Sequence, residues 1–205
     1  MRNADMDALL AALAGIFAGE GREAALRSAA LLRGAMGGDL WAAQPNCGFE
    51  AELFATASAP GAHPAAALVA AAQPCLPWGT NPADGKLSAE AAAATASATL
   101  LGPGDPIRCE DLLVGLFWQR PGSYYALHNH DADETYVILA GGAVWRAGAD
   151  KRRRGPGEMI HHPSGMPHAF QAGPQGLLAA WRWSGDVNFQ SYTMLPDPEA
   201  PPEAP

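Results

Sequence analysis

The stretch that decides the fold is YYALHNHDADETYVILAG, residues 124–141, which places four metal-binding or titratable side chains on even positions. His128 and His130 stand two residues apart, and Glu134 and Tyr136 follow with the same parity. Successive side chains of a β-strand point to opposite faces, so residues two apart share a face. The pattern therefore predicts strands that turn imidazoles, a carboxylate and a phenol towards one side.

Two spaced motifs surround these residues. The first, G(x)5HxH(x)3E(x)6G, runs from Gly122 to Gly141, and the second, G(x)5PxG(x)2H, runs from Gly157 to His168. Five of the six histidines of the chain lie between residues 128 and 168, and no cysteine falls within either motif. Imidazoles with one carboxylate suit a divalent transition metal, whereas a soft thiolate site is not indicated.

The chain changes character at LLGPGDPIRCEDL, a turn-rich segment at residues 100–112. After this segment, eight short apolar runs separated by glycine and proline predict an antiparallel barrel or sandwich. Before it, apolar residues recur at helical spacing. We expect helices over these ranges: 5–19, 22–35, about 64–73, and 87–100.

We accordingly expect three parts along the 205 residues. Residues 1–100 form a helical N-terminal cap region, 101–195 a β-barrel metal-binding domain, and 196–205 a disordered tail, because PDPEAPPEAP is proline-rich and acidic. The composition, with 48% hydrophobic and 17% charged residues, allows a packed core.

Charge and composition exclude several classes of protein. The formal net charge of −8 argues against a nucleic-acid partner, whose phosphates need a basic face. Three dispersed cysteines form no CxxC pair and indicate neither a zinc ribbon nor a disulfide framework. The apolar N-terminal run is too short for a membrane span, and Asp5 and Asp7 stand where a signal peptide needs positive charge. We expect a cytoplasmic protein without a membrane partner, either monomeric or homodimeric.

The two motifs resemble the paired motifs of the cupin superfamily, with Ala172 in place of the asparagine that often ends the second motif. This resemblance implies a mainly β fold with an α-helical N-terminal part. The expected architecture is a cupin-type double-stranded β-helix (jelly-roll) barrel covered by the N-terminal helices. A metal-binding barrel of this kind does not by itself name a reaction.

The combination HxH(x)3ExY, followed by HHPSGMPHAF, is similar to the DddQ/DddL group of dimethylsulfoniopropionate (DMSP) lyases. The segments LLGPGDPI, GLFWQRPGSYYALHNH and GAVWR extend this resemblance. It implies that a divalent metal is held by His130, Glu134, His168 and Tyr136. His128 matches the first histidine of the motif, whose role as a ligand stays open. Tyr125 corresponds to a further tyrosine that lines the pocket and is a second catalytic candidate beside Tyr136.

The chemistry that the resemblance implies is β-elimination. The substrate carboxylate binds the metal, which acidifies the α-C–H, and Tyr136 as phenolate removes the proton. Dimethyl sulfide then leaves and acrylate remains. Aromatic faces suit a sulfonium cation. The substrate-binding candidates are Tyr124, Tyr125 and Trp183, with Trp145 and Trp181 as further aromatic residues; ordinary barrel packing is the alternative for each tryptophan.

Several alternatives stay open. An O2-using cupin could bind Fe(II) through His128, His130, Glu134 and His168, with Tyr136 only structural. A non-catalytic small-molecule-binding cupin, or a lyase acting on another small carboxylate, also fits the motifs. The metal could be iron, zinc or manganese, because N/O ligands suit several ions. His161 and His162 fall outside the motif positions and are not expected to be ligands.

Overall fold

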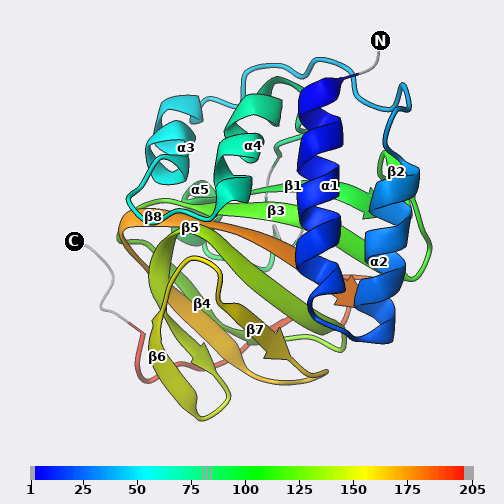
Figure 1. The fold of residues 1–205 in the computed structure, drawn as a ribbon. Helices are drawn as coiled ribbons and strands as arrows, with labels where there is room; N and C mark the ends of the chain where they lie inside the picture. Colours follow the sequence, from blue (N-terminus) through cyan, green and yellow to red (C-terminus); the bar gives the residue numbers. More distant parts are fainter. Residues whose placement is uncertain (1–2, 80, 82, 84, 201–205) are drawn as a thin grey trace.

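Helices occupy the first half of the chain and strands the second (Figure 1). The structure is a computed structural model that describes residues 3–79, 81, 83 and 85–200. The helices are α1 (Ala4–Ala18), α2 (Glu23–Gly34), α3 (Glu50–Ala57), α4 (Pro64–Ala72), the 3-10 turn η1 (Gln73–Cys75) and α5 (Ala89–Ala93). The strands are β1 (Thr95–Gly102), β2 (Ile107–Arg108), β3 (Leu112–Gln119), β4 (Tyr124–Asn129), β5 (Asp133–Ala147), β6 (Asp150–Arg154), β7 (Met159–His162), β8 (His168–Ser184) and β9 (Thr193–Met194).

The strands form one curled sheet in which β8 connects almost every part. The sheet order is β2-β1-β3-β8-β4-β9, and β5 pairs with β6, β7 and β8. The first half of β8 pairs with β4 and the second half pairs with β3. Strand β5 pairs antiparallel with β8 along both of these halves. A strand shared in this way brings the start of β8 beside β4, and thus joins the two segments that carry the sequence motifs.

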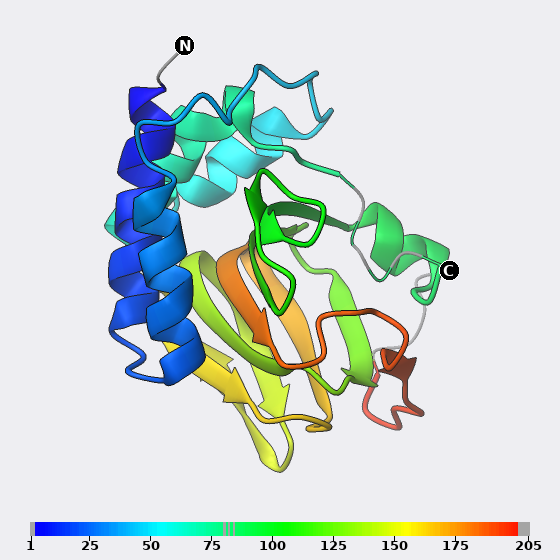
Figure 2. The same cartoon turned by 90° about the vertical axis from the view of Figure 1, so that its right-hand side faces the viewer.

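Part of the barrel wall is buried on both of its faces, because the long helices cover its outer face. Alternation along the strands separates two cores. Leu116 and Leu139 face α1 and α4 in the cap core, while Phe117 and Ile138 face the barrel interior. Figure 2 shows α1 and α2 on one side of the barrel and the orange-red segment after β8 on the opposite side. Strands with two buried faces explain why LLVGLFW, residues 112–118, is apolar throughout.

Helix α1 begins where the sequence predicts it. The side chain of Asn3 accepts hydrogen bonds from the backbone N–H groups of Asp5 and Met6 and so caps the helix. The buried stripe of this helix consists of Met6, Leu9, Leu10, Leu13, Ala14 and Phe17. Helices α2 and α4 likewise confirm the predicted helical ranges. Within the part of the chain that the structure describes, no helix combines the length and apolarity needed to cross a bilayer.

The helix predicted over residues 87–100 is wrong in its second half. Helix α5 ends at Ala93, and Thr95–Gly102 forms β1, which pairs antiparallel with β3. Cross-strand hydrogen bonds and burial of Ala98 and Leu100 outweigh the helical propensity of the alanines. The barrel sheet therefore starts at Thr95 instead of residue 101. Helix α3 was not among the predicted helices.

Residues 196–200 of the expected tail make charge contacts with the barrel. The hydroxyl group of Tyr124 donates to the carboxylate of Asp197, and the Arg146 guanidinium lies 3.4 Å from that carboxylate. Lys151 forms an ion pair with Glu199. These charge contacts hold the segment on the outside of the barrel. Residues 201–205, the rest of the expected tail, lie outside the described residues.

A buried ion pair joins the helical cap to the barrel. Arg182 of β8 is fully buried and donates two hydrogen bonds, of 3.1 and 2.7 Å, to the carboxylate of Glu20 in the α1–α2 turn. Arg182 also donates to Asp133 and Thr135, the two neighbours of Glu134 in β5. The same guanidinium therefore connects the cap to the strand that carries the central carboxylate of the motif.

We predict that Glu20→Gln lowers the free energy of unfolding by about 3 kcal/mol, because it leaves a buried guanidinium without its main counter-charge. The matched control is Glu52→Gln, which breaks a half-exposed ion pair with Arg120 and should cost at most about 1 kcal/mol. Urea denaturation measures both values. Equal losses for the two variants would contradict the structural role given to the buried pair.

Candidate metal centre and its cavity

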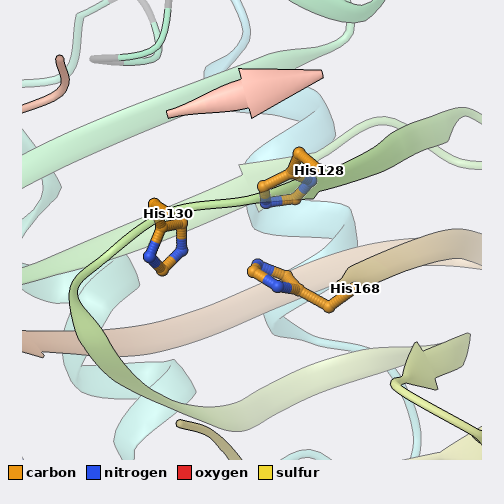
Figure 3. A group of neighbouring side chains, drawn as sticks. All are labelled: His128, His130 and His168. Atoms are coloured by element: carbon orange, nitrogen blue, oxygen red, sulfur yellow. The ribbon is translucent and has the colours of Figure 1, made fainter. Parts of the chain in front are cut away.

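Three histidines from two strands point into one buried space (Figure 3). His128 lies near the end of β4, His130 just after that strand, and His168 at the start of β8. The ring centroid of His168 lies 4.0 Å from that of His128 and 5.1 Å from that of His130. One potential ligand nitrogen from each of the three lies within 4.8 Å of the others. The two sequence motifs therefore meet at a single cluster.

Backbone carbonyl groups set the protonation of all three imidazoles. The Nδ1 atoms of His128, His130 and His168 lie 2.7, 3.2 and 2.9 Å from the carbonyl oxygens of Ala126, Ala132 and Met166, respectively. A carbonyl oxygen only accepts hydrogen bonds, so each Nδ1 carries the proton and donates it. Each Nε2 atom is left with a free lone pair, the form in which histidine binds a metal.

The carboxylate of Glu134 completes the cluster. Its Oε2 atom lies 3.5 Å from Nε2 of His130 and 3.2 Å from Nε2 of His168. The indole N–H of Trp183 donates to Oε1 over 2.5 Å, and Nδ1 of His162 lies 2.8 Å from Oε2. Both carboxylate oxygens thus have a fixed partner on the protein, and Oε2 also faces His130 and His168.

The cluster fits a divalent cation. The Nε2 atoms of His130 and His168 are buried and have no hydrogen-bond partner among the described residues. A buried nitrogen lone pair without a donor is costly, and a cation among three imidazoles and a carboxylate removes that cost. The described residues place His128, His130, His168 and Glu134 around this space, while Tyr136, the fifth predicted ligand, lines the adjoining cavity.

Burial shapes the titration of the cluster. Burial, and then the proximity of His168, lower the pKa of His128 well below 6.5. Burial also lowers the pKa of His162, to about 4. Burial alone would raise the pKa of Glu134, but the neighbouring histidines outweigh it and hold that pKa well below 4.5. Neutral imidazoles beside an ionised carboxylate are the protonation states that a metal site needs.

A cavity opens beside the cluster and is lined mainly by aromatic side chains. Its walls are Asn81, Ser97, Phe117, Tyr125, His128, Glu134, Tyr136, Trp181, Trp183, Phe189 and Tyr192. The hydroxyl oxygen of Tyr125 accepts hydrogen bonds from Asn81 and Tyr192, each over 2.8 Å. Burial, and then the carboxylate of Glu134, raise the pKa of Tyr136 well above 10. Three buried phenols, of Tyr125, Tyr136 and Tyr192, therefore line a small cavity beside the histidine cluster.

Tyr124, expected to bind substrate, lies on the outer surface of the barrel instead. Its hydroxyl group contacts Asp197, and it does not line the cavity. The reason is a shift of register in β4 between Tyr125 and His128. Such a bulge reverses the alternation of inward and outward side chains, so Tyr125 faces inward although its parity differs from that of His128. Trp183 does line the cavity, as expected.

Sequence reasoning missed His162, Asn81 and Tyr192, and also Ser97, Phe117 and Phe189 of the cavity wall. His162 pairs directly with Glu134 across β5 and β7, and the buried positions of β7 alternate, so strand parity was a usable signal. Asn81 and Tyr192 come from irregular segments far apart in the chain. Neither belongs to a motif, and only the folded chain brings them to Tyr125.

A curled antiparallel barrel whose two motifs place histidines and a glutamate around a cation site defines the cupin class of metal-binding proteins. A comparison with known families matches residues 27–179, most of the chain, to the family described as dimethylsulfoniopropionate lyase. The chain belongs to this family, which confirms both the predicted fold class and the predicted family.

Two curated relatives match the chain over part of their length. The chain is 37% identical to dimethylsulfoniopropionate lyase DddQ of Ruegeria pomeroyi over 101 residues, which cover 49% of the chain and 50% of the relative. It is 33% identical to the putative lyase DddL of Cereibacter sphaeroides over 88 residues, or 42% of the chain and 37% of the relative. The match thus spans half or less of each curated relative.

Solved structures show the same fold over nearly the whole chain. The crystal structure of DMSP lyase DddQ from Ruegeria pomeroyi superposes with a TM-score of 0.65 and 26% identity, and the match covers 94% of this chain and 97% of that one. A structure described with the DMSP lyases RdDddP and RnDddQII gives a TM-score of 0.64 at 22% identity, covering 93% of this chain and 100% of that one. The helical cap is therefore part of the shared fold.

We predict that the metal-free protein loses stability as the pH falls from 7.5 to 5. Folded His128 and His162 have lowered pKa values, while in the unfolded chain they take up protons near pH 6.5. Stability from such groups is present above about pH 6.5 and is lost as pH falls towards the folded pKa. Each of the two histidines should lower the free energy of unfolding by about 1.4 kcal/mol when the pH falls to 5.5.

Urea denaturation at several pH values measures this loss. A His162→Asn variant should show a shallower dependence, because it lacks one of the two groups. An unfolding free energy that stays constant between pH 7.5 and 5 would contradict the prediction.

Proposed function

We propose that this protein is a metal-dependent carbon–sulfur lyase that cleaves DMSP to dimethyl sulfide and acrylate by β-elimination. Membership of the family supports the reaction. The observation that carries the proposal is a cluster of three free Nε2 lone pairs and Glu134 that adjoins an aromatic cavity lined by the buried tyrosines Tyr125 and Tyr136. A cation site and a proton acceptor are the two parts that an elimination next to a carboxylate needs.

The residues that would hold the metal are His130, His168 and Glu134, with His128 as a third imidazole and Tyr136 as the ligand that the family resemblance implies. Iron, zinc and manganese all suit this donor set. When bound, the cation supplies Lewis acidity that draws electron density from the substrate carboxylate and makes the α-C–H more acidic.

Tyr136 is the proposed base. In the absence of a cation, burial and the negative charge of Glu134 keep its phenol protonated, since both raise its pKa. Positive charge in the cluster opposes both effects and favours the phenolate. Tyr136 then accepts the α-proton. The C–H bonding electrons form the new double bond, and the C–S pair leaves with dimethyl sulfide.

Aromatic walls suit the sulfonium end of the substrate. Phe117, Trp181 and Phe189 contribute ring faces to the cavity, and each well-placed ring attracts a cation by about 0.5–2 kcal/mol. Tyr125 is held by Asn81 and Tyr192 and is proposed to position the substrate beside Tyr136.

We predict that purified, metal-loaded protein releases dimethyl sulfide from DMSP and that Tyr136→Phe lowers this activity by several orders of magnitude. Removing a general base that acts in the transition state costs kcat more than binding. Headspace gas chromatography measures the sulfide, and elemental analysis measures the bound metal. The variant should keep more metal than His130→Ala, which removes an imidazole of the cluster.

The same assay under nitrogen separates elimination from O2-dependent chemistry, because elimination needs no oxidant. Activity lost without oxygen would favour an oxygenase. If the protein binds metal but releases no dimethyl sulfide, the proposed lyase activity is wrong and the proposed metal site is not affected. Full activity of Tyr136→Phe would show that another residue is the base.

A further inference from the structure

His162 differs from the other buried histidines of the site because both of its ring nitrogens already have partners. The indole N–H of Trp145 lies 3.0 Å from Nε2, and the carboxylate oxygen Oε2 of Glu134 lies 2.8 Å from Nδ1. The ring is buried and stacks on His168, with centroids 3.9 Å apart and planes inclined by 19°. Geometry alone would also allow His162 to bind a metal together with Glu134 and His168.

The two partners determine where the proton of His162 lies. An indole nitrogen can only donate a hydrogen bond, so Nε2 of His162 must accept. The single proton of the neutral ring therefore lies on Nδ1, which donates to Glu134. No lone pair of His162 remains for a cation. His128, His130 and His168 show the opposite arrangement, since their Nδ1 protons go to backbone carbonyls and their Nε2 atoms stay free.

We propose that Trp145 and His162 form a positioning pair that fixes the carboxylate of Glu134 for metal binding, with His162 acting through Glu134 and not as a ligand. This inference rests on the metal site proposed above. Trp183 holds Oε1 and His162 holds Oε2, so the carboxylate cannot rotate away from His130 and His168. Glu134 and His162 are direct cross-strand partners in β5 and β7, which places the His162 ring beside the Glu134 carboxylate.

The position of Trp145 makes this pair rigid. Its indole stacks on Phe170, with ring centroids 4.0 Å apart, and only 1% of the residue is exposed. Trp145 and Phe170 are cross-strand partners in β5 and β8. An aromatic stack that cannot shift keeps the indole N–H on Nε2, and Nε2 in turn cannot take the proton. Outer partners of this kind orient a metal ligand and tune its basicity.

The test compares two substitutions of His162 that differ in one donor. His162→Asn keeps an amide N–H near the place of Nδ1, while His162→Leu fills similar space without any donor. We expect His162→Leu to weaken cobalt(II) binding on the order of 10–100-fold and His162→Asn to restore most of that affinity. Competition with a chromophoric chelator measures affinity, and the visible absorption of bound cobalt reports its ligand set.

Removing the indole donor separates a positioning residue from a ligand. Trp145→Phe should weaken cobalt binding several-fold, because Nε2 can then take the proton and His162 no longer reliably donates to Glu134. If His162 were a ligand, the same change would free Nε2 and leave the affinity equal or higher. In that case His162→Asn would also lose as much affinity as His162→Leu, and the cobalt spectrum would change in both. Either result would overturn the proposal.

The neighbouring histidine provides a matched control. His161 lies on the outer side of β7 and contacts Asp133 and Arg22, so His161→Leu should leave cobalt affinity unchanged. Thermal unfolding of each metal-free variant identifies any loss of affinity that comes from misfolding. If the unsubstituted protein binds no cobalt, the proposed metal site itself fails. If it binds cobalt but His162→Leu binds equally well, only the positioning role fails.

Discussion

The structure depends on one constraint, which is that a carboxylate and three imidazoles must be kept inside a barrel from which water is largely excluded. Each of these groups has a hydrogen-bond partner on one side and a free lone pair on the other. Burial lowers the pKa of His128 and His162, while the neighbouring histidines hold the pKa of Glu134 well below 4.5. A cation among them would balance the remaining negative charge, so the folding of the barrel and the chemistry of the site share one electrostatic requirement.

The helical cap contributes to the same requirement. By covering the outer face of β3, β5 and β8, it buries those strands on both sides and makes the wall of the site rigid. Arg182 extends this support, since it binds Glu20 of the cap and both chain neighbours of Glu134. The α1–α2 turn therefore stabilises the position of the central carboxylate through Arg182, while Asn81, from the same N-terminal region, lies in the cavity wall itself.

Much of the site was predictable because its chemistry is local in sequence. The HxH(x)3E spacing and the second motif identified His128, His130, Glu134 and His168, all of which the fold brings together. The prediction of a helix over residues 87–100 was wrong in its second half, because the helical propensity of alanine is weak compared with the pairing of β1 and β3. The prediction that Tyr124 lines the cavity was wrong for a different reason. A bulge in β4 reverses the alternation of inward and outward side chains on which that prediction depended.

By itself, the sequence indicated the class of barrel, the family and a group of candidate metal ligands, since spacing along a strand is converted directly into a shared face. Only the tertiary structure decided how these groups are protonated and held. The roles of His162, Trp145 and Asn81 follow from hydrogen bonds between segments that are far apart in the chain. Such contacts depend on how the barrel closes, and no local pattern of residues encodes that closure.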